Sequence, residues 1–161
     1  MHPAYVAVVG ASAPEDPAVL DQARAAGRLL AEQGYVVVTG GLGGVMAAAA
    51  AGVAEVGGTA VALLPNEDRG SASPGHTVVL PTGMGEMRNA LIVRCVDAVL
   101  AVGGGWGTLS EIALAARTGV PVYAVGSWPL PGPHVTACES VSAAVDRLTD
   151  ALGRGTGPRP G

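Results

Sequence analysis

A turn of small residues joins a short apolar run, Ala98–Val102, to a segment with the periodicity of a helix. Backbone N–H groups at such a turn point away from the strand, and with the positive end of the helix dipole they form a binding site for an anion such as a phosphate. Glycines let a phosphate approach the backbone closely, and a threonine can add a hydroxyl or cap the helix. The residues that we expect to bind a phosphate here are Gly103, Gly104, Gly105, Gly107 and Thr108. The alternative is a tight turn that serves helix packing alone.

A carboxyl group follows this turn. Glu111 comes three residues after Thr108, so the two side chains face the same side of the first helical turn. Because a helix N-terminus favours negative charge, we expect Glu111 to be ionised. An ionised carboxylate can stabilise the positive charge that develops on a sugar ring when an N-glycosidic bond breaks, or it can orient a water molecule. Equally, Glu111 could be an exposed residue that only complements the helix dipole.

Two more turns of small residues follow predicted strands nearer the N-terminus. One is Gly10-Ala11-Ser12, after residues 5–9, and the other covers residues 40–46, after residues 35–39. Glycine in such turns allows a ligand to come close to the backbone. The residues that we assign to ligand binding here are Gly10, Ser12, Gly40, Gly41, Gly44 and Met46. Close packing of a helix on a strand explains the second turn as well, and Ser12 can equally cap a turn.

Strand and helix patterns alternate along the chain. Short apolar runs predict strands at residues 5–9, 35–39, 59–64, 77–80, 98–102 and 120–125. Helical periodicity predicts helices at residues 16–33, from the second glycine turn to about residue 56, and at 88–94, 109–116 and 139–152. This alternation is typical of an α/β protein with a Rossmann-like, doubly wound parallel sheet, which binds ligands at the carboxyl ends of its strands. We therefore expect a single Rossmann-like domain over residues 1–152, followed by a disordered, glycine- and proline-rich tail at 153–161.

The composition excludes several classes of function. The chain has 161 residues and a net charge of −4, and its 9 basic residues are all arginine. Without a lysine it can be neither a pyridoxal-phosphate enzyme, such as a true lysine decarboxylase, nor a Walker-type nucleotide-binding protein. Because nucleic-acid binding depends on a basic face, we expect no nucleic acid partner. The apolar runs are too short for a membrane span and the N-terminus lacks a signal-peptide pattern, so we expect a cytoplasmic protein with no membrane partner.

Neither the cysteines nor the histidines form a pattern typical of a metal site. Cys95 and Cys138 match no metal-ligand spacing, so we expect buried or idle thiols. His2, His76 and His134 fall in loops or at the terminus, without partners at ligand spacing. We therefore expect solvated histidines and no bound metal.

Some apolar residues near the site have two interpretations. Trp106 lies inside the glycine turn, where it could stack on the base of a ligand, but we expect it to pack against the turn. Leu91 and Ile92 lie on the apolar side of a predicted helix. That side is either a dimer face or part of the core.

The glycine turns resemble those of the Lonely Guy (LOG) superfamily, often labelled lysine-decarboxylase-like. Residues 103–111 match its signature P-G-G-x-G-T-x-x-E at every position except the proline, which is Gly103 here. Residues 40–46 are similar to its G-G-x-x-G-x-M turn, and residues 58–65 to its G-G-x-V-x-G-I-x-P segment. The resemblance covers roughly residues 6–125. It implies a dimeric phosphoribohydrolase, which releases the free base from a nucleoside 5′-monophosphate.

The resemblance also implies roles for individual residues. The turn that contains Thr108 would hold the phosphate, while Arg88 and Glu111 would flank C1′ of the ribose as the catalytic groups. Arg88 matches the arginine of the family's R-K pair, and Asn89 stands where that pair has its lysine, so Asn89 is a further candidate for ligand binding. Around Arg88 and in the glycine turn the sequence is more similar to molybdenum-cofactor carrier proteins than to cytokinin-activating enzymes. Those relatives bind a phosphorylated or pterin-type cofactor.

Two functions follow from these observations. The first is binding of a nucleotide-like phosphorylated molecule, such as a nucleoside monophosphate, with phosphoribohydrolase activity at Glu111 and Arg88. The alternative is a non-catalytic binder or carrier of a phosphorylated cofactor such as molybdenum cofactor. In both cases the partner is a small phosphorylated ligand, no additional cofactor is required, and we expect a homodimer or homotetramer.

Overall fold

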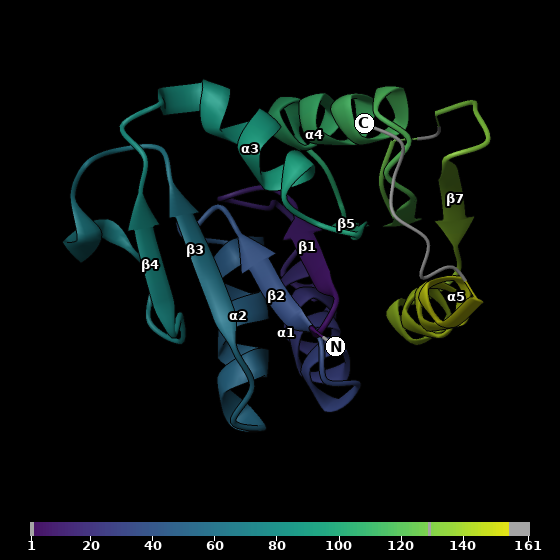
Figure 1. Cartoon of the computed structure of the whole chain (residues 1–161), viewed down its shortest axis with the longest axis horizontal. Helices are drawn as coiled ribbons and strands as arrows, with labels where there is room; N and C mark the ends of the chain where they lie inside the picture. The colour runs from purple at the N-terminus through teal and green to yellow at the C-terminus, as the bar shows by residue number, and fades with distance from the viewer. Residues whose placement is uncertain (1, 129, 155–161) are drawn as a thin grey trace.

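The computed structural model describes residues 2–128 and 130–154. Strands and helices alternate along them and build one parallel sheet of order β4-β3-β2-β1-β5-β6-β7, which confirms the expected Rossmann-like α/β fold (Figure 1). The strands are β1 (Tyr5–Val9), β2 (Val36–Thr39), β3 (Ala60–Leu64), β4 (Val78–Pro81), β5 (Ala98–Val102), β6 (Val122–Val125) and β7 (Val135–Cys138). The helices are α1 (Ala18–Glu32), α2 (Val45–Glu55), α3 (Arg88–Arg94), α4 (Trp106–Arg117) and α5 (Val141–Arg154), with short 3₁₀ turns η1 (Arg69–Ser71) and η2 (Gly85–Met87). No helix in these two ranges has the length and apolar character to cross a bilayer.

The strand order reverses between β1 and β5. The chain places β2, β3 and β4 on one side of β1 and then crosses back to place β5 on the other, with Val6 paired to Ala98 and Val9 to Ala101. The segments after β1 and β5 lead into α1 and α4, which pack on opposite faces of the sheet. A crevice therefore opens between these segments at the carboxyl ends of the strands, where open α/β sheets bind ligands.

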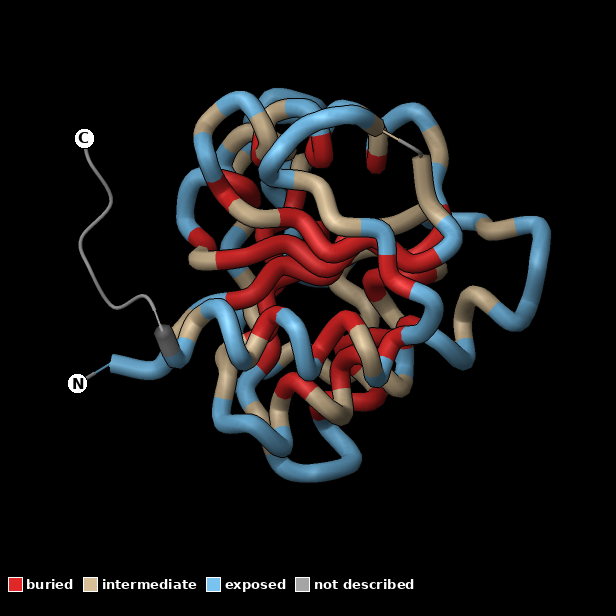
Figure 2. The backbone as a smooth tube through the Cα atoms, turned by 90° about the vertical axis from the view of Figure 1, so that its right-hand side faces the viewer, coloured by how far each residue is buried: buried red, intermediate tan, exposed pale blue. Residues whose placement is uncertain are grey.

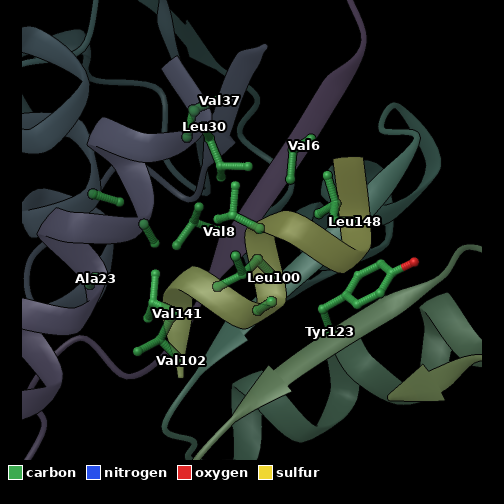
Figure 3. Packing of buried hydrophobic residues seen from close by; sticks show 14 of the residues in the cluster. Val6, Val8, Ala23, Leu30, Val37, Leu100, Val102, Tyr123, Val141 and Leu148 are labelled. Atoms are coloured by element: carbon green, nitrogen blue, oxygen red, sulfur yellow. The ribbon is translucent and has the colours of Figure 1, made fainter. Parts of the chain in front are cut away.

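Helices cover both faces of the sheet. α1, α2 and α5 pack on one face and α3 and α4 on the other, so two cores flank the buried strands (Figures 1 and 2). Leu30, Leu100 and Leu148 supply bulk in the first core (Figure 3), where alanine fills much of the rest. With such small side chains α1 and α2 approach closely: a Cβ atom on Gly27 would lie 2.0 Å from the Ala49 carbonyl oxygen. Glycine at position 27 is therefore required by the packing of these two helices.

Several element boundaries differ from the expected ones. Residues 135–138 form the edge strand β7, which was not among the expected strands. Two of its four residues are half buried and a third is exposed, so the apolar run of a buried strand is missing. α4 begins at Trp106 rather than at residue 109. α5 extends to Arg154, two residues into the segment expected to be a tail, and residues 155–161 of that segment lie outside the described residues.

The α3 side of the sheet is incompletely covered beside β3 and β4. α3 has only 7 residues, and next to it lies an apolar groove of about 400 Å³ that includes Tyr5, Leu80 and Leu91 in its lining. Of the two residues considered for a dimer face, Leu91 borders this groove, whereas Ile92 is fully buried in the core. Only part of that helix face is therefore available to a partner.

Candidate functional site

A cavity of about 550 Å³ opens at the carboxyl ends of the strands, between the segments that follow β1 and β5. Five segments of the chain contribute to its wall. The residues expected to bind or transform a ligand that line it are Gly10, Ser12, Met46, Arg88, Asn89, Gly105, Gly107, Thr108 and Glu111. The fold therefore gathers most of the candidate site into one hollow.

The first turn of α4 presents unpaired backbone donors beside this cavity. Gly103 adopts φ = 63°, which glycine alone adopts readily, and its N–H donates to the Val125 carbonyl at 2.9 Å. Gly105 is the N-cap and has no side chain to cap the helix, and the N–H of Leu109 is the first to bond back, to the Gly105 carbonyl. Within the described part of the chain, the N–H groups of residues 106–108 find no acceptor. Unpaired N–H groups at the positive end of a helix dipole are the kind of arrangement that can bind an anion.

Thr108 is the third residue of α4 and does not cap it. Its side chain is 2% exposed, and its hydroxyl has no hydrogen-bond partner among residues 2–128 and 130–154. Thr108 lines the cavity together with Gly107. A Cβ atom built on Gly105 or Gly107 would meet nothing within 4 Å, so the space in front of this turn is open to a ligand.

Arg88 is held in place by two strand ends. Its Nη1 donates to the carbonyl oxygens of Gly40 at 2.7 Å and Leu63 at 2.8 Å, and its side chain is buried. The Nε atom is also buried and has no partner within the described structure. Burial lowers the pKa of Arg88, and the nearby Glu111 carboxylate opposes that effect. A guanidinium stays protonated in proteins, so Arg88 is a fixed positive charge in the cavity wall whose Nε donor is buried and unpaired.

Glu111 is not the exposed residue that the alternative interpretation required, and its ionisation differs from our expectation. It lies in the second turn of α4, because the helix begins at Trp106, and it is 8% exposed. Removal from water raises its pKa to about 7, although the charge of Arg88 acts in the opposite direction. The effect of desolvation on this pKa thus outweighs the effect of the Arg88 charge. At neutral pH the carboxyl group is divided between its protonated and ionised forms.

Five expected site residues lie outside the cavity lining: Gly40, Gly41, Gly44, Gly103 and Gly104. In Gly40 a Cβ atom would lie 2.1 Å from Arg88 Nη1, and in Gly44 one would lie 2.4 Å from the Ala11 carbonyl oxygen. The second glycine turn therefore allows Arg88 and the loop after β1 to approach the backbone. This arrangement agrees with the alternative that the glycines of this turn serve close packing rather than ligand binding.

Asn89 and Glu86 add polar groups to the cavity wall. The Asn89 Nδ2 lies 3.5 Å from the Ser110 hydroxyl, a long hydrogen bond, and that hydroxyl itself donates to the Gly107 carbonyl at 2.7 Å. Glu86 was not among the expected site residues. In the sequence, only its position two residues before Arg88 could have suggested a place at the site. In the structure it belongs to the 3₁₀ turn η2.

His76 is not the solvated loop residue that we expected. Its Nε2 lies 2.7 Å from the hydroxyl of buried Thr39, and its Nδ1 lies 2.9 Å from the Ser73 carbonyl oxygen. The Thr39 oxygen also accepts the Gly41 N–H at 3.0 Å. Burial lowers the pKa of His76, against the effect of the Ser73 carbonyl, so the neutral ring donates to Ser73 and accepts from Thr39. These bonds tie the loop before β4 to the second glycine turn.

Trp106 does not pack into the turn, contrary to expectation. It is the first residue of α4, it is 79% exposed, and it lines the cavity. Its ring lies 5.3 Å from that of Trp128, centroid to centroid. The Trp128 Nε1 donates to the Gly105 carbonyl at 3.1 Å. No local pattern indicates that Trp128, which is 23 residues away from Gly105, reaches this turn.

Comparison with models of protein families shows the family to which the chain belongs. A model of the SLOG cluster4 family matches residues 3–150. This protein belongs to the SLOG cluster4 family. An uncharacterized protein from Archaeoglobus fulgidus is 46% identical over 93 residues, and the match covers 58% of this chain and 61% of that relative. The chain therefore spans less than two thirds of the length of this curated relative.

Two solved structures resemble this SLOG cluster4 protein over nearly their whole length. The molybdenum cofactor binding protein from Rippkaea orientalis has 29% identity and a TM-score of 0.90, covering 94% of this chain and 99% of that one. The Moco carrier protein from Chlamydomonas reinhardtii has 28% identity and a TM-score of 0.89, covering 96% of this chain and 100% of that one. The expected resemblance to molybdenum-cofactor carrier proteins is thus confirmed at the level of structure.

Proposed function

We propose that this protein binds and carries a phosphorylated cofactor of the molybdenum-cofactor type, with the phosphate held at the N-terminus of α4. The observation that carries the proposal is the buried Thr108 hydroxyl, which has no partner in the described structure and lies in the same helical turn as the unpaired N–H groups of residues 106–108. A buried hydroxyl without a partner costs free energy, and a bound ligand would complete its hydrogen bonding. The similarity to two molybdenum-cofactor binding proteins supports a ligand of this kind.

The residues of the cavity fit the organic part of such a cofactor, a phosphorylated pterin. The first turn of α4 and the Arg88 Nε offer donors to the phosphate. The volume of about 550 Å³ is in the ordinary range for a small-molecule site. The described residues contain no group of three or more His, Cys, Asp or Glu side chains that could hold a metal. The contacts that we propose are accordingly all made to the organic part of the cargo.

A second function, hydrolysis of a nucleoside monophosphate, is favoured by one observation. Glu111 has a pKa of about 7 and lines the same cavity as Arg88. A carboxyl group with this pKa can donate a proton near neutral pH. It would protonate the base nitrogen as the bond from C1′ to that nitrogen breaks. Water would then add to C1′ of the ribose and give its released proton to the Glu111 carboxylate, which restores the acid. We place this function second because Arg88 uses Nη1 to hold two backbone carbonyls.

Binding and turnover distinguish the two functions. The purified protein is titrated with GMP and with a phosphorylated pterin in a calorimeter, and the mixtures are then analysed by chromatography for free base. The carrier function predicts saturable binding and intact ligand. The hydrolase function predicts guanine release that the Glu111→Gln substitution abolishes. Failure of both probes to bind the wild-type protein would show that the proposal is wrong.

We also propose that the chain forms a homodimer or a larger homo-oligomer through the apolar groove beside β4. Parallel sheets are normally covered on both faces, and here Leu80 and Leu91 border a part of the sheet that α3 leaves uncovered. Sedimentation velocity would test this. A Leu80→Asp variant should sediment as a monomer, and a wild-type protein that is monomeric at all concentrations contradicts the proposal.

A further inference from the structure

Trp106 is the most exposed large apolar side chain among the described residues, at 79%. It is the first residue of α4, directly beside the N–H groups that we assign to the phosphate. Tryptophan is highly buried on average, so an exposed indole on the rim of a ligand cavity requires an explanation. The turn itself does not require its bulk, because the preceding glycine already forms the helix cap.

The indole of Trp106 is supported from one side by a second tryptophan. The two ring centroids are 5.3 Å apart and the planes are tilted by 34°, a geometry typical of attractive aromatic pairs. Trp128 in turn is fixed by its bond to the Gly105 carbonyl and lies so close to Gly104 that a Cβ atom there would come within 2.9 Å of its Nε1. Trp106 therefore rests on an anchored partner, which reduces the entropy that it loses when a ligand binds.

Trp106 also belongs to two neighbouring hollows. The main cavity contains Thr108 and Glu111, and a second hollow of about 460 Å³ contains Met87 and Leu114. Trp106 is part of the wall of both. A flat group placed on the indole would therefore lie at the junction of the polar cavity and the more apolar hollow.

We infer that Trp106 is a stacking platform for a planar heteroaromatic ring, so that the ligand is a phosphorylated molecule with such a ring a short linker away from its phosphate. The inference rests on the proposed function, because the indole and the phosphate-binding N–H groups belong to one helical turn. A ligand that uses both must carry its ring and its phosphate close together. Nucleotides and phosphorylated pterins meet this requirement, whereas sugar phosphates and inorganic phosphate lack the ring.

Two probes that differ only in the ring test this inference. GMP and ribose 5-phosphate share the sugar and the phosphate, and each is titrated into the wild-type protein and into the Trp106→Ala and Trp106→Phe variants. Stacking of a base on an aromatic side chain changes affinity by about tenfold or more. The wild-type protein should bind GMP at least about tenfold more tightly than ribose 5-phosphate. Trp106→Ala should remove that difference without weakening ribose 5-phosphate, and Trp106→Phe should keep most of it.

The outcomes separate this inference from the proposed function. If ribose 5-phosphate binds but GMP binds no more tightly, the proposed phosphate site is supported and the inference that Trp106 stacks on a ring is wrong. If Trp106→Ala weakens both probes equally, Trp106 only shapes the turn and the platform is again wrong. If neither probe binds, both proposals fail. In a Trp128→Phe protein, Trp106 is the only tryptophan, so quenching of its fluorescence by GMP but not by ribose 5-phosphate gives an independent readout.

Discussion

The Nη1 atom of Arg88 donates to the carbonyl oxygen of Gly40 at 2.7 Å, which joins the start of α3 to the turn after β2. The same nitrogen reaches the carbonyl of Leu63 in β3 at 2.8 Å. One side chain therefore fastens two strand ends and also forms part of the cavity wall. Arg88 has a structural role that is independent of any ligand.

The first prediction concerns the contribution of Arg88 to stability. Arg88→Met should lower the free energy of unfolding by about 2–4 kcal/mol, because two buried carbonyls lose their donor. Urea denaturation measures this change. Arg94→Met on the exposed side of the same helix is the matched control and should change stability by less than about 0.5 kcal/mol. Equal stability of the two variants would contradict the structural role.

The second prediction contrasts two glycines. Gly40→Ala should destabilise the protein by about 1–3 kcal/mol, because its Cβ atom would lie 2.1 Å from Arg88 Nη1 and 2.7 Å from the Met46 sulfur. Gly107→Ala adds a methyl group where nothing lies within 4 Å, in the first turn of a helix, and should not lower the melting temperature. Thermal unfolding of both variants measures the contrast. A stable Gly40→Ala variant would show that Arg88 can move away.

The third prediction concerns the unpaired hydroxyl at the cavity. Thr108→Val keeps the side-chain shape and removes the unpartnered hydroxyl, so the free protein should be at least as stable as wild type. Its affinity for GMP or a phosphorylated pterin should fall by about fivefold to tenfold. Thr149 in α5 is a matched control, because its hydroxyl is also buried without a partner in the described residues and it does not line the cavity. Thr149→Val should leave the affinity unchanged. A Thr108→Val protein with wild-type affinity removes the main support for the phosphate site.

The fourth prediction concerns pH. The pKa of Glu111 is raised to about 7 in the folded protein from 4.5, so the folded state binds this proton more tightly than the unfolded state. Proton binding by Glu111 therefore contributes fully to the stability of the folded protein below pH 4.5, and this contribution is lost as the pH rises to about 7 and above. Glu111→Gln cannot ionise and should be more stable than wild type by about 3 kcal/mol at pH 8, with little difference at pH 4. Unfolding free energies at the two pH values measure this, and an equal gain at both pH values would indicate a packing effect instead.

The sequence was sufficient to predict all the α-helices, every strand except β7, and the glycine turn at the start of α4. These elements depend on local patterns, since buried parallel strands are continuous apolar runs and glycine turns follow them directly. The sequence could not show that Glu111 is buried, because burial depends on α3 and the loop after β1, which come from elsewhere in the chain. The environments of Arg88 and of His76 were missed for the same reason.

Exposure was equally hard to predict from local patterns. Trp106 was expected to pack because it is large and apolar, yet its position at the start of α4 leaves it on the surface beside Trp128. β7 was missed because an edge strand with half-exposed residues lacks the apolar run that marks a central one. In both cases the place of the element in the fold, rather than the local pattern, decides how exposed its residues are.

The pairing of β1 with β5 sets the time at which the proposed ligand can first bind during synthesis of the chain. Val6 pairs with Ala98, so the crevice cannot form until the ribosome has released the chain through β5 and the first turn of α4. A nascent chain that ends before these residues has β1 and the second glycine turn but no anion site. On the proposed function, cofactor binding therefore follows the pairing of β1 with β5, and any structure that the first four strands form earlier is formed without a bound ligand.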